Sequence, residues 1–173
     1  MSGGDLESRA RAFASGAHAA AGQRRKYTLT PYIEHPAAVV ELVRGVPHDP
    51  AMLAAAWLHD TVEDTQVTRE DIAREFGAEV ASLVDQLTDV SRPGDGNRAA
   101  RKAIDREHTA RAEPRAKTIK LADLIDNSRS ILERDPKFAA VYLREKAALL
   151  EVLREGDATM WAEAERIVGE GLR

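Results

Sequence analysis

The stretch Ala51–Thr65, AMLAAAWLHDTVEDT, changes from apolar to mainly polar and charged residues at its middle. Every residue from Ala51 to Leu58 is apolar, and an apolar segment without a polar face predicts a buried helix. His59 and Asp60 follow at once, which puts charge at the edge of the core, where it is costly unless it is paired. Imidazole nitrogen and carboxylate oxygen are both ligands of divalent metal ions. The stretch therefore predicts a helical core that ends in a candidate metal-binding pair.

Composition sets the class of protein. The chain has 173 residues, 43% of them hydrophobic, which is enough to bury a core and argues against disorder. It has no cysteine, which excludes disulfides, zinc–thiolate sites and a cysteine nucleophile and fits the cytoplasm. The longest apolar run has about eight residues, too short to span a bilayer, and no signal peptide is evident. A net charge of −4 argues against a general nucleic-acid binder but leaves room for a local basic pocket.

The rest of the chain favours helices, because Ala, Leu, Glu and Arg abound, aromatic residues make up only 5%, and no segment alternates as a strand would. Gly22 ends the first helix, and Thr68 opens a short helix with a capping-box pattern that Gly77 closes. We expect an all-α helical bundle, one domain over residues 1–173. The expected helices span roughly 5–21, 31–44, 50–62, 69–76, 78–90, 98–112, 115–133, 137–154 and 157–171.

Two further segments carry chemically active residues. The segment 31–36, PYIEHP, places His35 in the first turn of the second expected helix. On the helix 115–133, steps of three and four residues put Lys120, Asp123 and Asn127 on one face, opposite an apolar stripe. Periodicity alone would therefore make Asp123 a solvated residue.

Each of these features also has an ordinary explanation. A single His-Asp pair occurs by chance in many proteins, and a histidine before a proline can be a simple helix cap. Glu63 and Asp64 fit a surface pair at a helix end, and the basic run Arg24-Arg25-Lys26 fits a solvated loop. Spacing alone supports only a helical domain with a candidate metal site.

The combination is more specific than its parts. Taken in order, His35, His59-Asp60 and Asp123 form the H…HD…D ligand pattern of the HD-domain metal-dependent phosphohydrolases. The strings HDTVEDT and PYIEHP, with KLAD at 120–123 and Asn127, closely resemble the hydrolase domain of the RelA/SpoT alarmone enzymes. They also resemble its stand-alone relatives, the small alarmone hydrolases and the metazoan SpoT homologue. The resemblance covers about residues 10–150, the C-terminal helices would complete the bundle, and the length leaves no room for a synthetase domain.

The resemblance implies a site as well as a fold. It implies one Mn²⁺ ion, although other transition metals could take its place, and a catalytic acidic pair that moves protons at the attacking water and the leaving oxygen. It also implies cations that meet the base and phosphates of a nucleotide, and polar residues near its ribose. The implied metal ligands are His35, His59, Asp60 and Asp123; the catalytic pair is Glu63 and Asp64; the substrate-binding residues are Arg25, Lys26, Lys120, Asn127 and Ser130.

The implied reaction is hydrolysis of the 3′-diphosphate of ppGpp or pppGpp to GDP or GTP and pyrophosphate, an activity of the stringent response. The expected partner is a small nucleotide, without nucleic acid or membrane, and the sequence leaves the oligomeric state open. Two alternatives remain: an HD-type enzyme that acts on another nucleotide, such as NADPH or ppApp, and a non-catalytic nucleotide sensor. The retained acidic pair argues against the sensor, because metal binding alone does not require it.

The sequence departs from the family pattern at two places. The family often has a histidine two residues before the Gly-Gln of the basic loop, where this chain has Ala20. His18 matches that histidine only with a gap, so no role is assigned to it. Residues 91–113 follow no family pattern, and their basic residues Arg98, Arg101 and Lys102 are candidates for contact with the substrate's phosphates.

Overall fold

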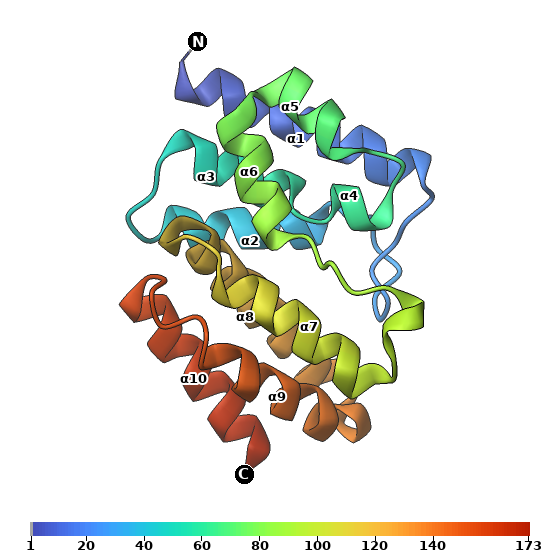
Figure 1. Ribbon diagram of the computed structural model, residues 1–173, viewed down its shortest axis with the longest axis vertical. Helices are drawn as coiled ribbons and strands as arrows, with labels where there is room; N and C mark the ends of the chain where they lie inside the picture. Colours follow the sequence, from blue (N-terminus) through green and yellow to red (C-terminus); the bar gives the residue numbers. More distant parts are fainter. Residues whose placement is uncertain (1) are drawn as a thin grey trace. The chain divides into compact units, whose positions relative to one another are not determined.

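The computed structural model describes residues 2–173, which form helices joined by loops (Figure 1). Within these residues no β-strand forms, and the only extended pairing is an isolated bridge between Arg24 and Pro31. The predicted all-α fold is therefore confirmed. The chain divides into two compact units, the first ending at Thr88 and the second spanning Asp89–Arg173. The prediction that both belong to one domain stays a prediction.

The first unit is built around the apolar helix of the opening stretch. It contains α1 (Gly3–Ala20), α2 (Glu34–Arg44), α3 (Pro50–Leu58), α4 (Thr61–Asp64), α5 (Arg69–Phe76) and α6 (Ala78–Leu87). Every residue from Ala51 to Leu58 is buried, and α3 packs against α1, α2 and α6. Asp49 caps α3, because its Oδ1 accepts a hydrogen bond of 2.9 Å from the Met52 N–H. The prediction of a buried helix is thus confirmed.

The predicted end of that helix is wrong. Sequence patterns extended it to about Val62, whereas α3 ends at Leu58, and His59 and Asp60 form a turn before α4. Backbone carbonyls that would accept N–H groups in a continuous helix are contacted here by side chains instead. His59 Nδ1 lies 2.7 Å from the Ala56 carbonyl oxygen, and Thr61 Oγ1 donates to the Leu58 carbonyl at 2.7 Å.

The start of the second helix also differs from the prediction. We expected Pro31 in its first turn, but α2 begins at Glu34, and Pro31 precedes the turn that leads into it. The capping box at Thr68 is confirmed, since its hydroxyl accepts from the Asp71 N–H and the Asp71 carboxylate accepts from the Thr68 N–H. Gly77 follows α5 with φ 91°, a conformation that suits glycine.

The second unit consists of a short 3₁₀ turn, η1 (Pro93–Asp95), and the helices α7 (Arg98–Ala110), α8 (Pro114–Arg134), α9 (Pro136–Leu150) and α10 (Ala158–Leu172). The long helix α8 packs against α9 and α10. Its buried Lys117 donates to the Ala110 carbonyl at 3.0 Å and to Glu155 Oε1 at 2.6 Å. One side chain therefore connects α8 to the end of α7 and to the loop before α10. Across residues 2–173, no helix is both long enough and apolar enough to cross a membrane.

Candidate metal centre and acidic pair

His59 is held in a defined orientation by the break after α3. Its Nδ1 lies 2.7 Å from the Ala56 carbonyl, which can only accept, so Nδ1 carries the proton. In the neutral ring, the lone pair then lies on Nε2, which faces Asp60 Oδ2 at 3.1 Å. A backbone carbonyl that binds the far nitrogen in this way is the usual arrangement of a metal-ligating histidine.

His35 approaches the same carboxylate from the first turn of α2. Its Nε2 lies 3.6 Å from Asp60 Oδ2, and its ring meets the His59 ring edge to face at 5.3 Å. The ligand atoms of His35, His59 and Asp60 all lie within 4.8 Å of one another, and both histidines are buried. Lone pairs of neutral imidazoles that face a carboxylate repel it unless a cation lies between them. The three residues, predicted from the sequence, thus form a group that could hold a divalent metal ion.

Tyr32 adds a contact that the sequence analysis did not assign. Its hydroxyl donates a hydrogen bond of 2.5 Å to Asp60 Oδ2, the oxygen that the two histidines face. Its ring lies 5.9 Å from the His35 ring and 4.8 Å from the His18 ring. Tyr32 precedes His35 by three residues in the PYIEHP string, but nothing in that spacing indicated a bond to Asp60.

The acidic pair, Glu63 and Asp64, lies on α4 and follows His59 and Asp60 by four residues in the chain. Although Asp64 is exposed as a residue, partial burial of its carboxyl group raises the pKa of that group, and the charge of Asp60 raises it further. The polar side chain of Gln23 and the nearby His18 and His59 oppose this rise in the pKa. Asp64 therefore keeps a proton more readily than an ordinary aspartic acid.

The predicted nucleotide-binding cations Arg25 and Lys26 lie in the loop between α1 and α2. This loop is closed by the Arg24–Pro31 bridge and by hydrogen bonds of 3.0 Å from the Arg25 N–H to the Thr30 carbonyl and from the Leu29 N–H to the Arg25 carbonyl. Arg25 is half-buried and Lys26 is exposed. The loop is thus a hydrogen-bonded turn that carries both cations.

In the second unit, α8 brings together three of the four residues predicted there. Asn127 Nδ2 donates to Asp123 Oδ1 at 2.9 Å, and Lys120 Nζ lies 3.7 Å from Asp123 Oδ2. Asp123 is buried, so the solvated position that periodicity alone suggested is wrong. Ser130 is half-buried, farther along the helix.

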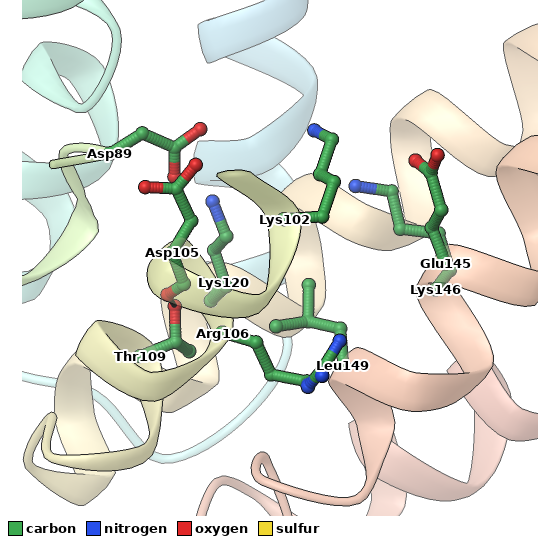
Figure 2. A pocket seen from close by; sticks show the side chains of 9 residues that line it. All are labelled: Asp89, Lys102, Asp105, Arg106, Thr109, Lys120, Glu145, Lys146 and Leu149. Atoms are coloured by element: carbon green, nitrogen blue, oxygen red, sulfur yellow. Dashed lines mark hydrogen bonds between the residues drawn. The ribbon is translucent and has the colours of Figure 1, made fainter. Parts of the chain in front are cut away.

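The second unit also contains a basic pocket that sequence spacing did not reveal. Figure 2 shows Lys102, Lys120 and Lys146 around its middle, with acidic residues on either side. Burial and the charge of Lys120 lower the pKa of Lys146 to about 8. A bound anion would relieve this repulsion between cations. The pocket is lined by Asp89, Lys102, Asp105, Arg106, Thr109, Lys120, Glu145, Lys146 and Leu149.

Two of the acids in this pocket already have partners. Asp105 accepts hydrogen bonds from the N–H groups of Val90 and Ser91 at 2.9 and 2.8 Å and from the Ser91 hydroxyl at 2.7 Å. Glu145 accepts from Arg98 Nε at 2.6 Å and from its Nη2 at 3.0 Å. Arg98, a predicted phosphate contact, is therefore engaged in an ion pair.

Comparisons with known proteins agree with this geometry. The HD domain family model matches residues 10–154. The guanosine-3′,5′-bis(diphosphate) 3′-pyrophosphohydrolase MESH1 of Xenopus tropicalis is 40% identical over 118 residues, which cover 66% of this chain and 64% of that protein. The human protein of the same name is 39% identical over 119 residues, with the same coverage. A GTP pyrophosphokinase of Streptomyces coelicolor is 42% identical over 111 residues, 64% of this chain but only 13% of that protein.

A solved structure shows the same fold. A metazoan ortholog of SpoT, which hydrolyzes ppGpp and plays a role in starvation responses, superimposes with a TM-score of 0.85 at 31% identity. That superposition covers 97% of both chains. The chain thus spans less than two thirds of the curated relatives named above, but nearly all of this structure. With the family model matched over most of its length and the histidine–aspartate group in place, the chain belongs to the HD domain family.

Proposed function

We propose that this protein hydrolyses the 3′-diphosphate of a guanosine alarmone, ppGpp or pppGpp, and releases pyrophosphate intact. The observation that carries the proposal is the convergence of His35 Nε2 and His59 Nε2 on Asp60 Oδ2 in a chain of the HD domain family. The names of the similar proteins supply the substrate class. Because the family match spans both units, we also propose that they act as one domain.

We propose that one Mn²⁺ ion is held by His35, His59 and Asp60, with Asp123 as the fourth ligand. The donor set supports this, since two imidazole nitrogens and carboxylate oxygens suit a borderline-to-hard divalent ion. When bound, the ion would act as a Lewis acid that polarises a phosphoryl oxygen. Tyr32 would keep Asp60 oriented through its hydrogen bond to Oδ2.

We assign the two members of the acidic pair to different proton transfers. Water attacks the phosphorus attached to the 3′ oxygen, the P–O3′ bond breaks, and the nucleoside oxygen takes up a proton. Asp64 suits the role of acid at that oxygen because its pKa is raised. Glu63 then takes the proton from the attacking water.

Substrate binding would use the cations of each unit. We propose that Arg25 stacks on the guanine and that Lys26 meets a phosphate, since a guanidinium can stack on a purine and keep its charge. Lys120 and the lysines beside it in the pocket of Figure 2 would bind phosphate groups. Asn127 and Ser130 would contact the ribose or its phosphate.

A substrate panel tests the proposal. Protein purified without chelator is incubated with Mn²⁺ and, separately, ppGpp, pppGpp, ppApp and NADPH, and the products are separated. We expect GDP or GTP with pyrophosphate, and loss of turnover in Asp60→Asn but not in the control Asp85→Asn on α6. Activity on NADPH or ppApp alone would overturn the substrate, and orthophosphate as the only phosphate product would indicate a phosphatase. No turnover of any substrate would overturn the proposed function.

A further inference from the structure

The helix α7 lines the basic pocket with polar side chains and buries no apolar one. Its two buried residues are Asp105 and Thr109, and its largest apolar residue, Ile104, is 37% exposed. A surface helix of a globular protein usually keeps its place by packing an apolar face on the core. Apolar packing therefore does not hold α7 in position.

Polar contacts attach the two ends of α7 to the rest of the second unit. At the C-terminal end, the buried Lys117 of α8 donates to the Ala110 carbonyl at 3.0 Å. At the N-terminal end, Arg98 Nε and Nη2 donate to the Glu145 carboxylate of α9 at 2.6 and 3.0 Å. The side chains of Arg98 and Glu145 are 50% and 20% exposed. Because an exposed ion pair contributes little stability, the N-terminal end is the more easily released.

The sequence around α7 suits movement of the intact helix. Asn97 Oδ1 caps the helix by accepting a hydrogen bond of 3.0 Å from the Ala100 N–H, and most residues that follow are good helix formers. The loop before it contains Gly94 and Gly96, and Gly96 has φ 111°, a conformation that suits glycine. Loop residues that absorb backbone rotation commonly form the hinges of moving elements. α7 can thus keep its helical form while its N-terminal end moves.

The charges in the pocket favour opening without an anion and closure with one. The three lysines come from three different helices, Lys102 from α7, Lys120 from α8 and Lys146 from α9 (Figure 2). Without an anion, Lys102 is repelled by the other two, whereas an anion among them attracts all three. Of the residues that line the pocket, Leu149 is the only apolar one, so opening exposes little apolar surface.

We propose that α7 is a lid on this pocket that pivots at Ala110, is latched by the Arg98–Glu145 ion pair, and closes when the lysines bind a phosphate group. The identity of the anion, a phosphate group of the nucleotide, rests on the proposed function. Closure excludes water from that group, which strengthens its attraction to Lys102. Binding of a phosphate group is thereby coupled to the position of a whole helix.

Amide hydrogen exchange of the full chain tests the lid without turnover. The probe is inorganic pyrophosphate, added to protein stripped of metal so that it cannot bind through a metal ion. Without the probe, we expect the amides of α7 to exchange at least about 10-fold faster than those of α8. With it, the amides of α7 should slow together by about 10-fold or more. Amides of α7 that are as slow as those of α8, or that do not respond to the probe, would overturn the proposal.

A substitution on α7 separates a moving lid from a fixed binding site. Lys102→Gln removes the pocket lysine that α7 carries, so pyrophosphate should no longer slow the exchange of this helix. The control Lys137→Gln removes an exposed lysine of α9 outside the pocket and should leave the slowing intact. Slowing confined to the amides next to Lys102 would mean a fixed site and would refute the lid.

A second substitution tests the latch. Arg98→Gln removes an exposed ion pair and should speed the exchange of α7 about two- to fivefold without the probe. The control Arg129→Gln removes a comparable pair between α8 and α10, Arg129–Glu163 at 3.2 Å, and should leave α7 unchanged. Equal acceleration of α7 in both variants would overturn the role of Arg98 as a latch.

Turnover of ppGpp with Mn²⁺ separates failure of the lid from failure of the proposed function. If ppGpp is not hydrolysed but pyrophosphate slows the exchange of α7, the proposed function fails and the lid stands. If ppGpp is hydrolysed but α7 does not respond to pyrophosphate, only the lid is removed.

Discussion

Tyr32→Phe should weaken metal binding without unfolding the protein. The substitution removes one hydroxyl, which donates to Asp60 Oδ2 at 2.5 Å. The aromatic ring stays, and with it the contacts to the His18 and His35 rings at 4.8 and 5.9 Å. The change therefore isolates the hydrogen bond that orients a proposed ligand.

The expected loss of Mn²⁺ affinity follows from the strength of that hydrogen bond. A hydrogen bond to a charged group contributes about 1.5–3 kcal/mol, and each 1.4 kcal/mol or so is tenfold in an equilibrium constant. Loss of the bond alone would thus weaken Mn²⁺ binding by roughly 10- to 150-fold. Removal of an outer contact to a metal ligand typically costs about 10–100-fold, which agrees. We expect a dissociation constant for Mn²⁺ raised about 10–100-fold.

Competition with a metal-binding dye on chelator-stripped protein measures this affinity directly. Tyr27→Phe is the matched control, because it removes a tyrosine hydroxyl from the loop before α2 and should leave Mn²⁺ affinity unchanged. Circular dichroism in the presence of chelator checks that Tyr32→Phe keeps the helical fold. An affinity within twofold of the unaltered protein would refute the claim that Tyr32 orients Asp60.

Three further predictions concern the pocket and the fold. Because the pKa of Lys146 is lowered to about 8, its positive charge is present below pH 8 and lost above it, so KM for ppGpp should rise up to about 10-fold from pH 7 to 9. Lys146→Arg stays charged, and an equal rise of KM there would rule out Lys146 as the cause. Asp49→Ala removes the cap of α3 and should lower the free energy of unfolding by about 0.5–2 kcal/mol in urea titrations; no change would mean that water replaces the cap. Asp105→Ala should speed hydrogen exchange at the amides of residues 90 and 91 about 10-fold or more, and unchanged exchange would show that other contacts hold this loop.

The helices could be predicted from the amino-acid composition and from the residues that begin and end helices. The apolar run before Leu58 predicted α3, and Gly22 and Gly77 ended helices where their positive φ angles were needed. The end of α3 was predicted wrongly because side chains there compete for backbone groups. No period in the sequence shows that Thr61 Oγ1 will bind the Leu58 carbonyl and end α3 there.

The site, too, could be predicted only in part. His35, His59 and Asp60 were found from their order and flanking strings, and their ligand atoms lie together in the first unit. Tyr32 and Gln23 were not assigned, because their contacts arise from the loop between α1 and α2, where neither helical nor strand spacing applies. His18 was left without a role because a gap separates it from the family position, yet in the structure its Nδ1 lies 2.9 Å from Gln23 Oε1.

The break after α3 explains how an apolar helix can end in a candidate metal site. In a continuous helix, neighbouring residues point about 100° apart, so His59 and Asp60 could not turn toward a common point. The turn after Leu58 brings His59 Nε2 within 3.1 Å of Asp60 Oδ2. The turn costs little free energy. The Ala56 and Leu58 carbonyls lose their helical N–H partners, but they gain hydrogen bonds from His59 Nδ1 and Thr61 Oγ1. The same exchange fixes the imidazole so that its Nε2 lone pair faces Asp60, and the residue that ends the helix thereby becomes a metal-binding candidate.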